Sequence, residues 1–214
     1  MSGGFPEEAL VFYEGLEADN SKAYWTDHKA VYERAVRQPL DALLAELAPE
    51  FGTAKVFRPY RDVRFSKDKS PYKTAAAAVV EGDGSLYLQL GADGLYVGGG
   101  YWHTETDQVQ RLRAAVDDDR SGRALQAVLD GLAGWEVMGE RLKRVPKPYS
   151  PDHPRADLLV HKTLAAGRRF EPAEWLHTAE GGERVAAAWR QVQPLNAWLA
   201  RHVGPTRQER PARR

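Results

Sequence analysis

The residues with the clearest capacity for chemistry are basic and lie together between Arg58 and Thr74. This segment holds three Arg, three Lys and two Tyr but only two Asp. Crowded cations repel one another, so a fold that gathers them either receives an anion or leaves them on a solvated loop. Guanidinium groups bind phosphate or carboxylate through paired hydrogen bonds, and an ammonium group adds a point charge. We expect an anion-binding site in which Asp62 orients an Arg, with the solvated loop as the alternative. The residues assigned to this site are Arg61, Asp62, Arg64, Lys69, Tyr72 and Lys73.

A second basic segment lies in a proline-rich loop, where Lys143, Arg144 and Lys147 occur close together. Both basic segments have little acidic relief nearby, and we predict that they converge on one cleft. A run of three glycines, 98–100, lies between them in the sequence. The backbone at Gly99 would let either a ligand or a packed helix approach closely, and both interpretations stay open.

Familiar catalytic and metal-binding motifs are absent from the sequence. The chain has no Cys, which excludes disulfides, thiolate nucleophiles and cysteine metal sites. It also lacks the Gly-Lys-Ser/Thr phosphate loop, the Gly-x-Ser-x-Gly elbow and His-Glu-x-x-His. We therefore expect no metal site and can name no cofactor. Whether the protein is an enzyme stays open, and acid–base chemistry would have to use Asp62, Asp68 or His153.

The overall charge balance limits the class of partner. Lys plus Arg number 30 and Asp plus Glu number 30, so the formal net charge is zero. Nucleic-acid-coating proteins usually carry a basic excess, so a compact pocket for a small anion is favoured over a nucleic-acid track. The first residues lack a secretion-signal pattern, and the longest apolar run, 75–80, is too short to cross a membrane. We expect a cytoplasmic protein without membrane association, and the sequence does not indicate its oligomeric state.

Elements of two kinds must position these residues, and they occur in blocks. Apolar residues at helical spacing predict helices over 6–16 and 22–47, the second divided at Pro39. Short alternating or apolar runs then predict a sheet, which must be antiparallel because the connections are too short for helical crossovers. The predicted strands cover 62–66, 75–81, 86–90 and 95–98.

Helical spacing returns in the second half of the chain. The predicted helices cover 104–116, 121–132 with Ser121 as its cap, 154–164, 172–177 and 183–202. The predicted fold class is α+β, with N-terminal helices, a central antiparallel sheet and C-terminal helices. We expect a single domain over 1–205 and a disordered basic tail over 206–214.

Several motifs occur in an order that points to a known family. The most specific is the run Arg-Asp-Val-Arg-Phe-Ser-Lys-Asp-Lys-Ser-Pro-Tyr-Lys over 61–73, and nearly the whole chain, about 5–203, takes part. The chain resembles the bacterial and fungal family called domain of unknown function 2461, a conserved uncharacterised family. The resemblance implies a single-domain cytoplasmic protein, and it implies no activity, cofactor or partner.

Charge and spacing therefore provide the expectation about function. We expect the protein to bind an anionic, phosphorylated small molecule in a basic cleft, with nucleic acid as the weaker alternative partner. A second hypothesis is an enzyme of phosphoryl transfer or hydrolysis. A third is a protein-interaction module that receives an acidic partner.

Overall fold

The computed structural model describes residues 3–64, 66–82 and 84–208. The chain divides into two compact units, and each is described by itself. The first unit comprises Met1–Glu81, Leu86–Val97 and Arg169–Trp189. The second comprises Gly82–Ser85, Gly98–Arg168 and Arg190–Arg214.

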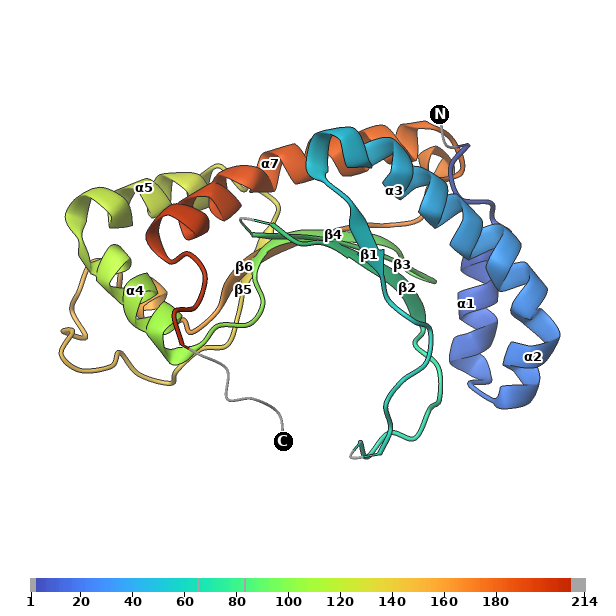
Figure 1. The fold of residues 1–214 in the computed structure, drawn as a ribbon, viewed down its shortest axis with the longest axis horizontal. Helices are drawn as coiled ribbons and strands as arrows, with labels where there is room; N and C mark the ends of the chain where they lie inside the picture. The colour runs from blue at the N-terminus through green and yellow to red at the C-terminus, as the bar shows by residue number, and fades with distance from the viewer. Residues whose placement is uncertain (1–2, 65, 83, 209–214) are drawn as a thin grey trace. The chain divides into compact units, whose positions relative to one another are not determined.

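The first unit begins with helices that follow one another almost without interruption (Figure 1). Their bounds are α1 Glu8–Ala18, α2 Lys22–Val31, a π-helical segment Tyr32–Arg37 and α3 Gln38–Phe51. The side chain of Ser21 caps α2 by accepting a hydrogen bond from the Tyr24 N–H at 3.1 Å. The predicted division at Pro39 occurs instead over the π-helical segment, because Pro39 lies in the first turn of α3, where a missing N–H costs little.

The strands form one antiparallel sheet in the order β1-β2-β3-β4-β6-β5. The strands predicted over 86–90 and 95–98 correspond to β3 and β4, and the two-residue connection 92–93 joins them as a hairpin. Gly94 follows it with a φ of 94°, a conformation that favours glycine. The strand bounds are β1 Ala54–Val56, β2 Ala75–Val80, β3 Ser85–Gly91, β4 Gly94–Tyr101, β5 Glu136–Met138 and β6 Leu164–Phe170.

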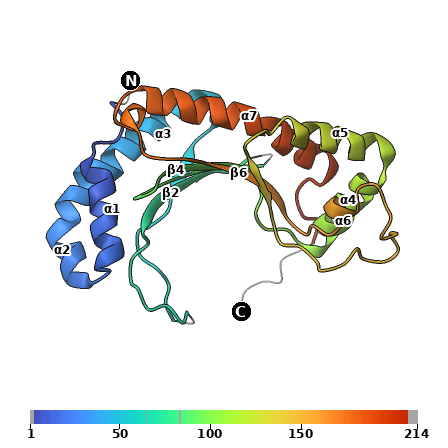
Figure 2. The ribbon, with the colours of Figure 1, turned by 180° about the vertical axis from the view of Figure 1, so that it is seen from behind.

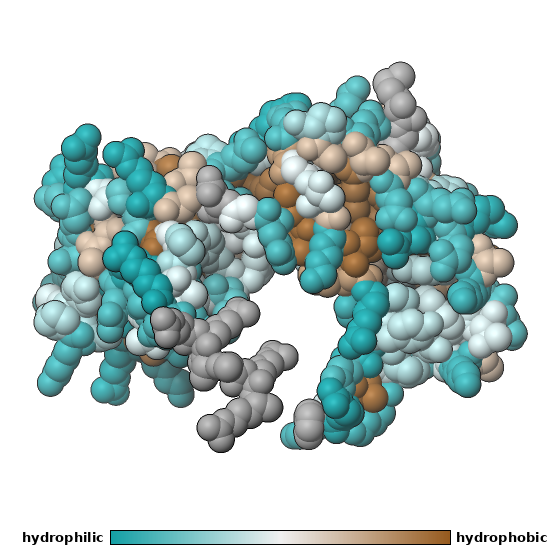
Figure 3. All heavy atoms as spheres, in the orientation of Figure 1, coloured by the Kyte–Doolittle hydropathy of each residue, from teal (hydrophilic) through white to brown (hydrophobic). Residues whose placement is uncertain are grey.

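Within the first unit, α3 and the beginning of α7 (Glu180–His202) pack on one face of the strands, as Figure 1 and Figure 2 both show. Trp189 anchors α7 by donating from its indole N–H to the Tyr87 carbonyl at 3.1 Å, and its ring meets Phe51 edge-on at 5.2 Å. Figure 3 shows hydrophobic residues gathered beneath α3, around the position that β1 has in Figure 1. This face of the strands therefore forms part of the hydrophobic core.

The alternation of side chains along β3 leaves the other face available. Leu86, Leu88 and Leu90 point into the core and are buried, whereas Tyr87 and Gln89 are half-buried on the opposite face. Because successive side chains of a strand point to opposite faces, Tyr87 and Gln89 share a surface with the alternate residues of β2. This surface contains the candidate site described below.

The second unit contains short helices around the C-terminal part of α7. The helix α4 has a capping box in which Glu105 and Gln108 satisfy each other's backbone N–H groups. The buried guanidinium of Arg155 donates to the carbonyls of Val116 at 2.6 Å and Asp117 at 2.9 Å, and so satisfies the end of α4. The helices are α4 Thr106–Asp117, α5 Asp119–Asp130 and α6 Ala156–Leu159, with a 3₁₀ turn at Glu174–His177 in the first unit.

The α+β fold class is confirmed, while several element assignments require correction. The predicted strand over 62–66 is a loop in its described residues, because Arg64 folds back to bond Asp62 rather than pairing with a neighbouring strand. Asp118, not Ser121, caps α5, and the Ser121 N–H is the group it caps. The sequence patterns do not predict β5 and β6, and the helix predicted over 154–164 is only α6.

The predicted tail begins with residues that contact α4. The Thr206 hydroxyl and the Arg207 N–H each donate to the Asp107 carboxylate at 2.8 Å, and residues 209–214 lie outside the described part. The hydrogen bonds from Arg207 and Thr206, together with the nearby Arg111, hold the pKa of the Asp107 carboxyl far below its usual value, although burial acts in the opposite direction. Among the described residues, none of the helices has the length and apolar character that a bilayer crossing requires.

Candidate functional site

A cavity of about 470 Å³ lies on the available face of the strands in the first unit. Two cations stand at it, together with two hydroxyl groups, two aromatic rings, an amide and two alanine methyl groups. The lining residues are Phe57, Arg61, Lys73, Thr74, Ala75, Ala77, Tyr87 and Gln89. Only Arg61 and Lys73 come from the set that the sequence analysis assigned to an anion site.

The hollow exists because β2 presents alanines between larger side chains of its neighbours. Ala77 pairs with Gln89 of β3, and its carbonyl accepts the Phe57 N–H at 2.8 Å on the other side. The methyl groups of Ala75 and Ala77 therefore form a floor, with Phe57 on one side and Gln89 on the other. A larger residue at position 77 would fill this space.

A two-stranded arm extends β1 and β2 and holds the two cations at the cavity. Its strands are joined by the Arg61 N–H to the Pro71 carbonyl at 2.9 Å and by the Lys73 N–H to the Pro59 carbonyl at 2.8 Å. An isolated bridge pairs Tyr60 with Tyr72 between these two bonds. The backbone positions of Arg61 and Lys73 are thus fixed by pairing with the opposite strand.

The arm is attached to the helical part of the unit at Tyr72. The Asn20 amide donates to the Tyr72 carbonyl at 3.1 Å and accepts the Tyr72 N–H at 3.0 Å. The Tyr72 ring is buried and stacks on Trp25, with centroids 4.4 Å apart and planes 8° from parallel. Burial, and then the neighbouring Tyr60, raises the pKa of the Tyr72 hydroxyl. Tyr72, predicted as a ligand-binding residue, therefore anchors the arm by its backbone and its ring.

Lys73 is a half-buried cation whose ammonium nitrogen lies 5.1 Å from the centroid of the Phe57 ring. Burial, and then the nearby Arg58, lowers the pKa of Lys73 below its usual value. The ion pairs recorded in the described part of this segment join Arg61 to Asp68 and Arg64 to Asp62, and neither includes Arg58 or Lys73. Among the described residues, these two neighbouring positive charges thus have no recorded ion pair with a carboxylate.

Asp62, Arg64 and Lys69 have partners within the same segment. Asp62 holds the Arg64 guanidinium through two hydrogen bonds of 2.9 and 2.7 Å, and the Arg64 side chain is 76% exposed. Lys69 donates to the Val63 carbonyl at 3.0 Å. Both cations are exposed and lie outside the lining of the cavity. The tip of the arm therefore behaves as a solvated loop with its own ion pairs.

The carboxylates of this segment are poorly suited to acid–base chemistry at neutral pH. Hydrogen bonds from Ser70, and then Arg61, lower the pKa of Asp68 to about 2. The hydrogen bonds from Arg64 lower the pKa of Asp62. Both groups are therefore ionised and paired, and neither is set to accept a proton.

The floor of the cavity carries an amide with donors to offer. The Tyr87 hydroxyl donates to Gln89 Oε1 at 2.8 Å, and burial raises the pKa of Tyr87. The structure records no hydrogen bond for Gln89 Nε2 within the described residues. The two N–H groups of this amide are therefore the part of Gln89 that a ligand can use.

The remaining predicted site residues belong to the second unit. Lys143, Arg144 and Lys147 are exposed. A Cβ atom at Gly99 would lie 2.7 Å from a methyl group of Val192, so glycine here makes room for α7. The convergence of the two basic segments on one cleft stays a prediction.

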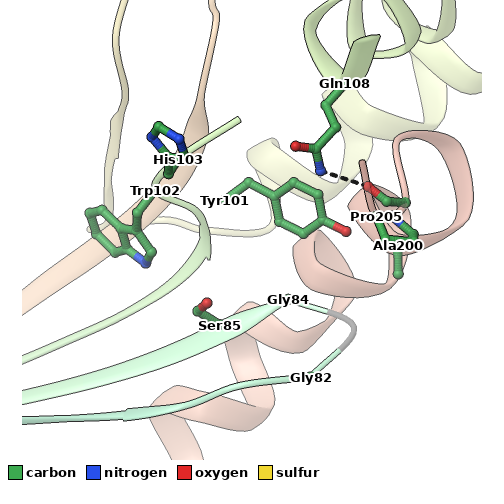
Figure 4. Close-up of a pocket in the computed structure, with 10 residues that line it drawn as sticks. Gly82, Gly84, Ser85, Tyr101, Trp102, His103, Gln108, Ala200 and Pro205 are labelled. Carbon is green, nitrogen blue, oxygen red and sulfur yellow. Dashed lines mark hydrogen bonds between the residues drawn. The ribbon is translucent and has the colours of Figure 1, made fainter. Parts of the chain in front are cut away.

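The second unit has a cavity of its own, of about 450 Å³, shown in Figure 4. Neither Arg nor Lys occurs among its described lining residues, which include Trp102 and the largely exposed His103. Gln108 donates to the Gly204 carbonyl at 2.8 Å and accepts the Glu105 N–H at 2.9 Å, so its amide is engaged. This cavity offers an anion much less than the cavity of the first unit does.

His153, the remaining acid–base candidate, is held by contacts to Arg155 and Asp117. Its Nδ1 accepts the Arg155 N–H at 3.0 Å, and its Nε2 lies 3.3 Å from an Asp117 carboxylate oxygen. The ring therefore connects the segment before α6 to the end of α4. Within the described ranges there is also no group of three or more His, Asp or Glu residues that could hold a metal ion.

The uncharged residues of the cavity were not predicted from the sequence; they are Phe57, Thr74, Ala75, Ala77, Tyr87 and Gln89. One signal was present: Ala75–Ala78 is a run of four small residues in a predicted strand, flanked in sequence by Lys73. Such a run leaves space on whichever face lacks a covering helix. Which larger side chains border that space depends on strand register, which the sequence does not fix.

A comparison with protein families identifies the same family that the motif at 61–73 indicated. A family model described as "Conserved hypothetical protein (DUF2461)" matches residues 8–198. A search of the curated proteins finds no match to the chain. The match covers most of the 214 residues and confirms the family resemblance. The chain therefore belongs to the conserved family of domain of unknown function 2461.

Proposed function

We propose that this protein binds a small anionic molecule, a phosphate ester or a carboxylate, in the cavity of its first unit. Lys73 and Arg61 hold the anionic group, and Arg58 adds positive potential beside Lys73. The alanine floor receives the uncharged part of the ligand. The proposed site is thus narrower than the set of basic residues that the sequence analysis assigned to it.

The observation that carries the proposal is the state of Lys73. Lys73 is half-buried, and its ammonium group stands beside an aromatic ring and another cation, with no recorded ion pair in the described part of the segment. Burying a charge without a partner is costly, and an anion in the cavity would remove that cost. Anion binding should accordingly raise the pKa of Lys73 and stabilise the folded protein.

Arg61 supports the same proposal in a different way. Its guanidinium is engaged with Asp68 at the cavity, and its side chain remains 36% exposed. A guanidinium has five N–H donors, so it can bind a ligand oxygen without giving up the carboxylate. The ion pair with Asp68 would then hold Arg61 in position before the ligand arrives.

The test is the affinity of the full chain for phenyl phosphate, measured by calorimetry, with Lys73 replaced. We expect Lys73→Met to weaken binding about tenfold or more, since a hydrogen bond to a charged group contributes roughly 1.5–3 kcal/mol. Lys55→Met is the matched control, because Lys55 is an exposed lysine of β1 outside the cavity lining. Equal affinities for the wild type and Lys73→Met would overturn the proposal.

A further inference from the structure

We propose that the ligand of this cavity carries a planar ring next to its anionic group, and that the ring is held over Ala77 between Phe57 and Gln89. The ligand class is an aromatic or heteroaromatic phosphate or carboxylate, up to the size of a mononucleotide. This inference rests on the proposed anion site and specifies the uncharged part of its ligand.

The spacing of the strands leaves a slot above Ala77. Phe57 continues β1 by one backbone hydrogen bond, Ala77 lies on β2, and Gln89 lies opposite Ala77 on β3. Adjacent strands lie about 4.8 Å apart, so the side chains that flank Ala77 stand two spacings, roughly 10 Å, apart. Van der Waals contacts of about 3.5–4.0 Å on each side leave room for one ring between them.

The side chains that border this slot favour a ring with hydrogen-bond acceptors at its edge. Phe57 presents an aromatic surface, and the Tyr87 ring is fixed by an edge-on contact with Tyr96 at 6.1 Å. Gln89 Nε2 can donate to a ring carbonyl or ring nitrogen, because Gln89 Oε1 already accepts from Tyr87. Rings with acceptors at their edge match this combination better than an aliphatic chain or a bare sugar does.

Lys73 lies close to Phe57 at one side of the slot. The Lys73 ammonium lies 5.1 Å from the Phe57 centroid, so an anion that it binds stands directly beside that wall. A ligand that uses both features must carry its anionic group close to its ring. The volume of about 470 Å³ lies within the range of roughly 300–1,000 Å³ that is usual for small-molecule sites.

The experiment compares probes by calorimetry on the full chain. The probes are inorganic phosphate, ribose 5-phosphate, phenyl phosphate, benzoate and uridine 5′-monophosphate. We expect phenyl phosphate and uridine monophosphate to bind about tenfold tighter than ribose 5-phosphate, because stacking of a ring on an aromatic side chain contributes a free energy of this order. The pair of phenyl phosphate and benzoate, which share a ring, shows whether phosphate or carboxylate is the preferred anion.

Two variants test the slot itself. Ala77→Leu should remove the advantage of the ring-bearing probes by filling the slot, and should leave the affinity for inorganic phosphate nearly unchanged. Val79→Leu is the control, because Val79 is the next residue on the same face of β2 and lies outside the lining. Gln89→Leu should weaken uridine monophosphate more than phenyl phosphate, which has no acceptor on its ring.

The outcomes separate this inference from the proposal on which it rests. If ribose 5-phosphate binds as tightly as the ring-bearing probes and Ala77→Leu changes nothing, the ring slot is refuted while the anion site stands. If no probe binds, or if Lys73→Met leaves every affinity unchanged, the anion site is refuted and the slot with it.

Discussion

Lys73 and Arg61 stand at the same cavity but differ in what surrounds their charge. Arg61 has Asp68 as a counter-ion, whereas Lys73 has an aromatic ring and the cationic neighbour Arg58. A buried or crowded lysine loses its proton more readily than a guanidinium, which stays charged at all relevant pH values. The pH dependence of ligand binding should therefore come from Lys73.

We predict that phosphate-ester affinity falls as the pH rises through the pKa of Lys73, at a lower pH than an ordinary lysine would give. The sign follows because only the protonated ammonium attracts the anion, and burial with Arg58 lowers that pKa. Carbon NMR of the lysine ε-methylene groups, assigned with Lys73→Arg, measures the pKa directly. Ligand should raise it, by linkage.

The exposed Arg58 offers the control for this prediction. Arg58→Gln removes the repulsion that contributes to the lowered pKa, so the titration midpoint of Lys73 should move upward. The midpoint should not reach that of an exposed lysine, because burial is the larger cause. A Lys73 midpoint equal to those of the exposed lysines in the wild type would contradict the account.

At the scale of elements, Asn20 provides a polar attachment between the arm and the helices. Asn20 satisfies both backbone groups of Tyr72, and Trp25 stacks on its ring. In the sequence, Asn20 precedes the helix predicted over 22–47 and Tyr72 lies in the basic segment, 52 positions further along the chain. Their contact is a tertiary property, which explains why the sequence did not indicate that Tyr72 also anchors the arm.

We predict that Asn20→Ala destabilises the protein by about 1–3 kcal/mol, since it leaves two backbone groups of Tyr72 without partners. It should also weaken phosphate-ester binding, because the arm that positions Lys73 and Arg61 loses its attachment. Urea unfolding and calorimetry measure the two effects. Asn20→Asp keeps the acceptor and loses the donor, so its effect on stability should be smaller.

The affinity of Asn20→Ala, compared with its stability, distinguishes this account from a general loss of folding. Were Asn20→Ala to lower stability without changing the affinity measured well below the unfolding transition, the arm would not depend on this attachment. The Trp25 stack would then be sufficient to position it.

The same scale shows which features the sequence could predict. Helices with apolar residues at regular spacing, such as α1 and α4, and the β3–β4 hairpin were accessible because their signals are local. The strand β6 escaped because Leu164–Gly167 is short, small and not β-branched, and it is stabilised by its neighbours β4 and β5. The cavity could not be predicted from the sequence for a related reason, since strand pairing brings Phe57, Ala77 and Gln89 together.

At the scale of the whole molecule, the balance of charge limits how long an anionic ligand can be. Positive and negative residues number 30 each, and two of the six cations of the basic segment form ion pairs with Asp62 and Asp68. In the first unit the cations that face the cavity are Arg61 and Lys73. A site built in this way suits one anionic group, whereas a nucleic-acid track needs a row of cations along the backbone.

We therefore predict weak binding of a 20-nucleotide single strand at about 0.15 M salt, and a shallow salt dependence for phenyl phosphate. A nucleic-acid binder loses affinity steeply with salt, with a slope of about −0.7 per phosphate neutralised on a single strand. A chain ending at Gln208 removes the three Arg residues of 209–214 and keeps the bonds of Thr206 and Arg207 to Asp107. It should lose most of the residual oligonucleotide binding and retain its affinity for phenyl phosphate. Tight oligonucleotide binding by the shortened chain, with a slope of several units, would instead make nucleic acid the ligand and the small-anion site a misinterpretation.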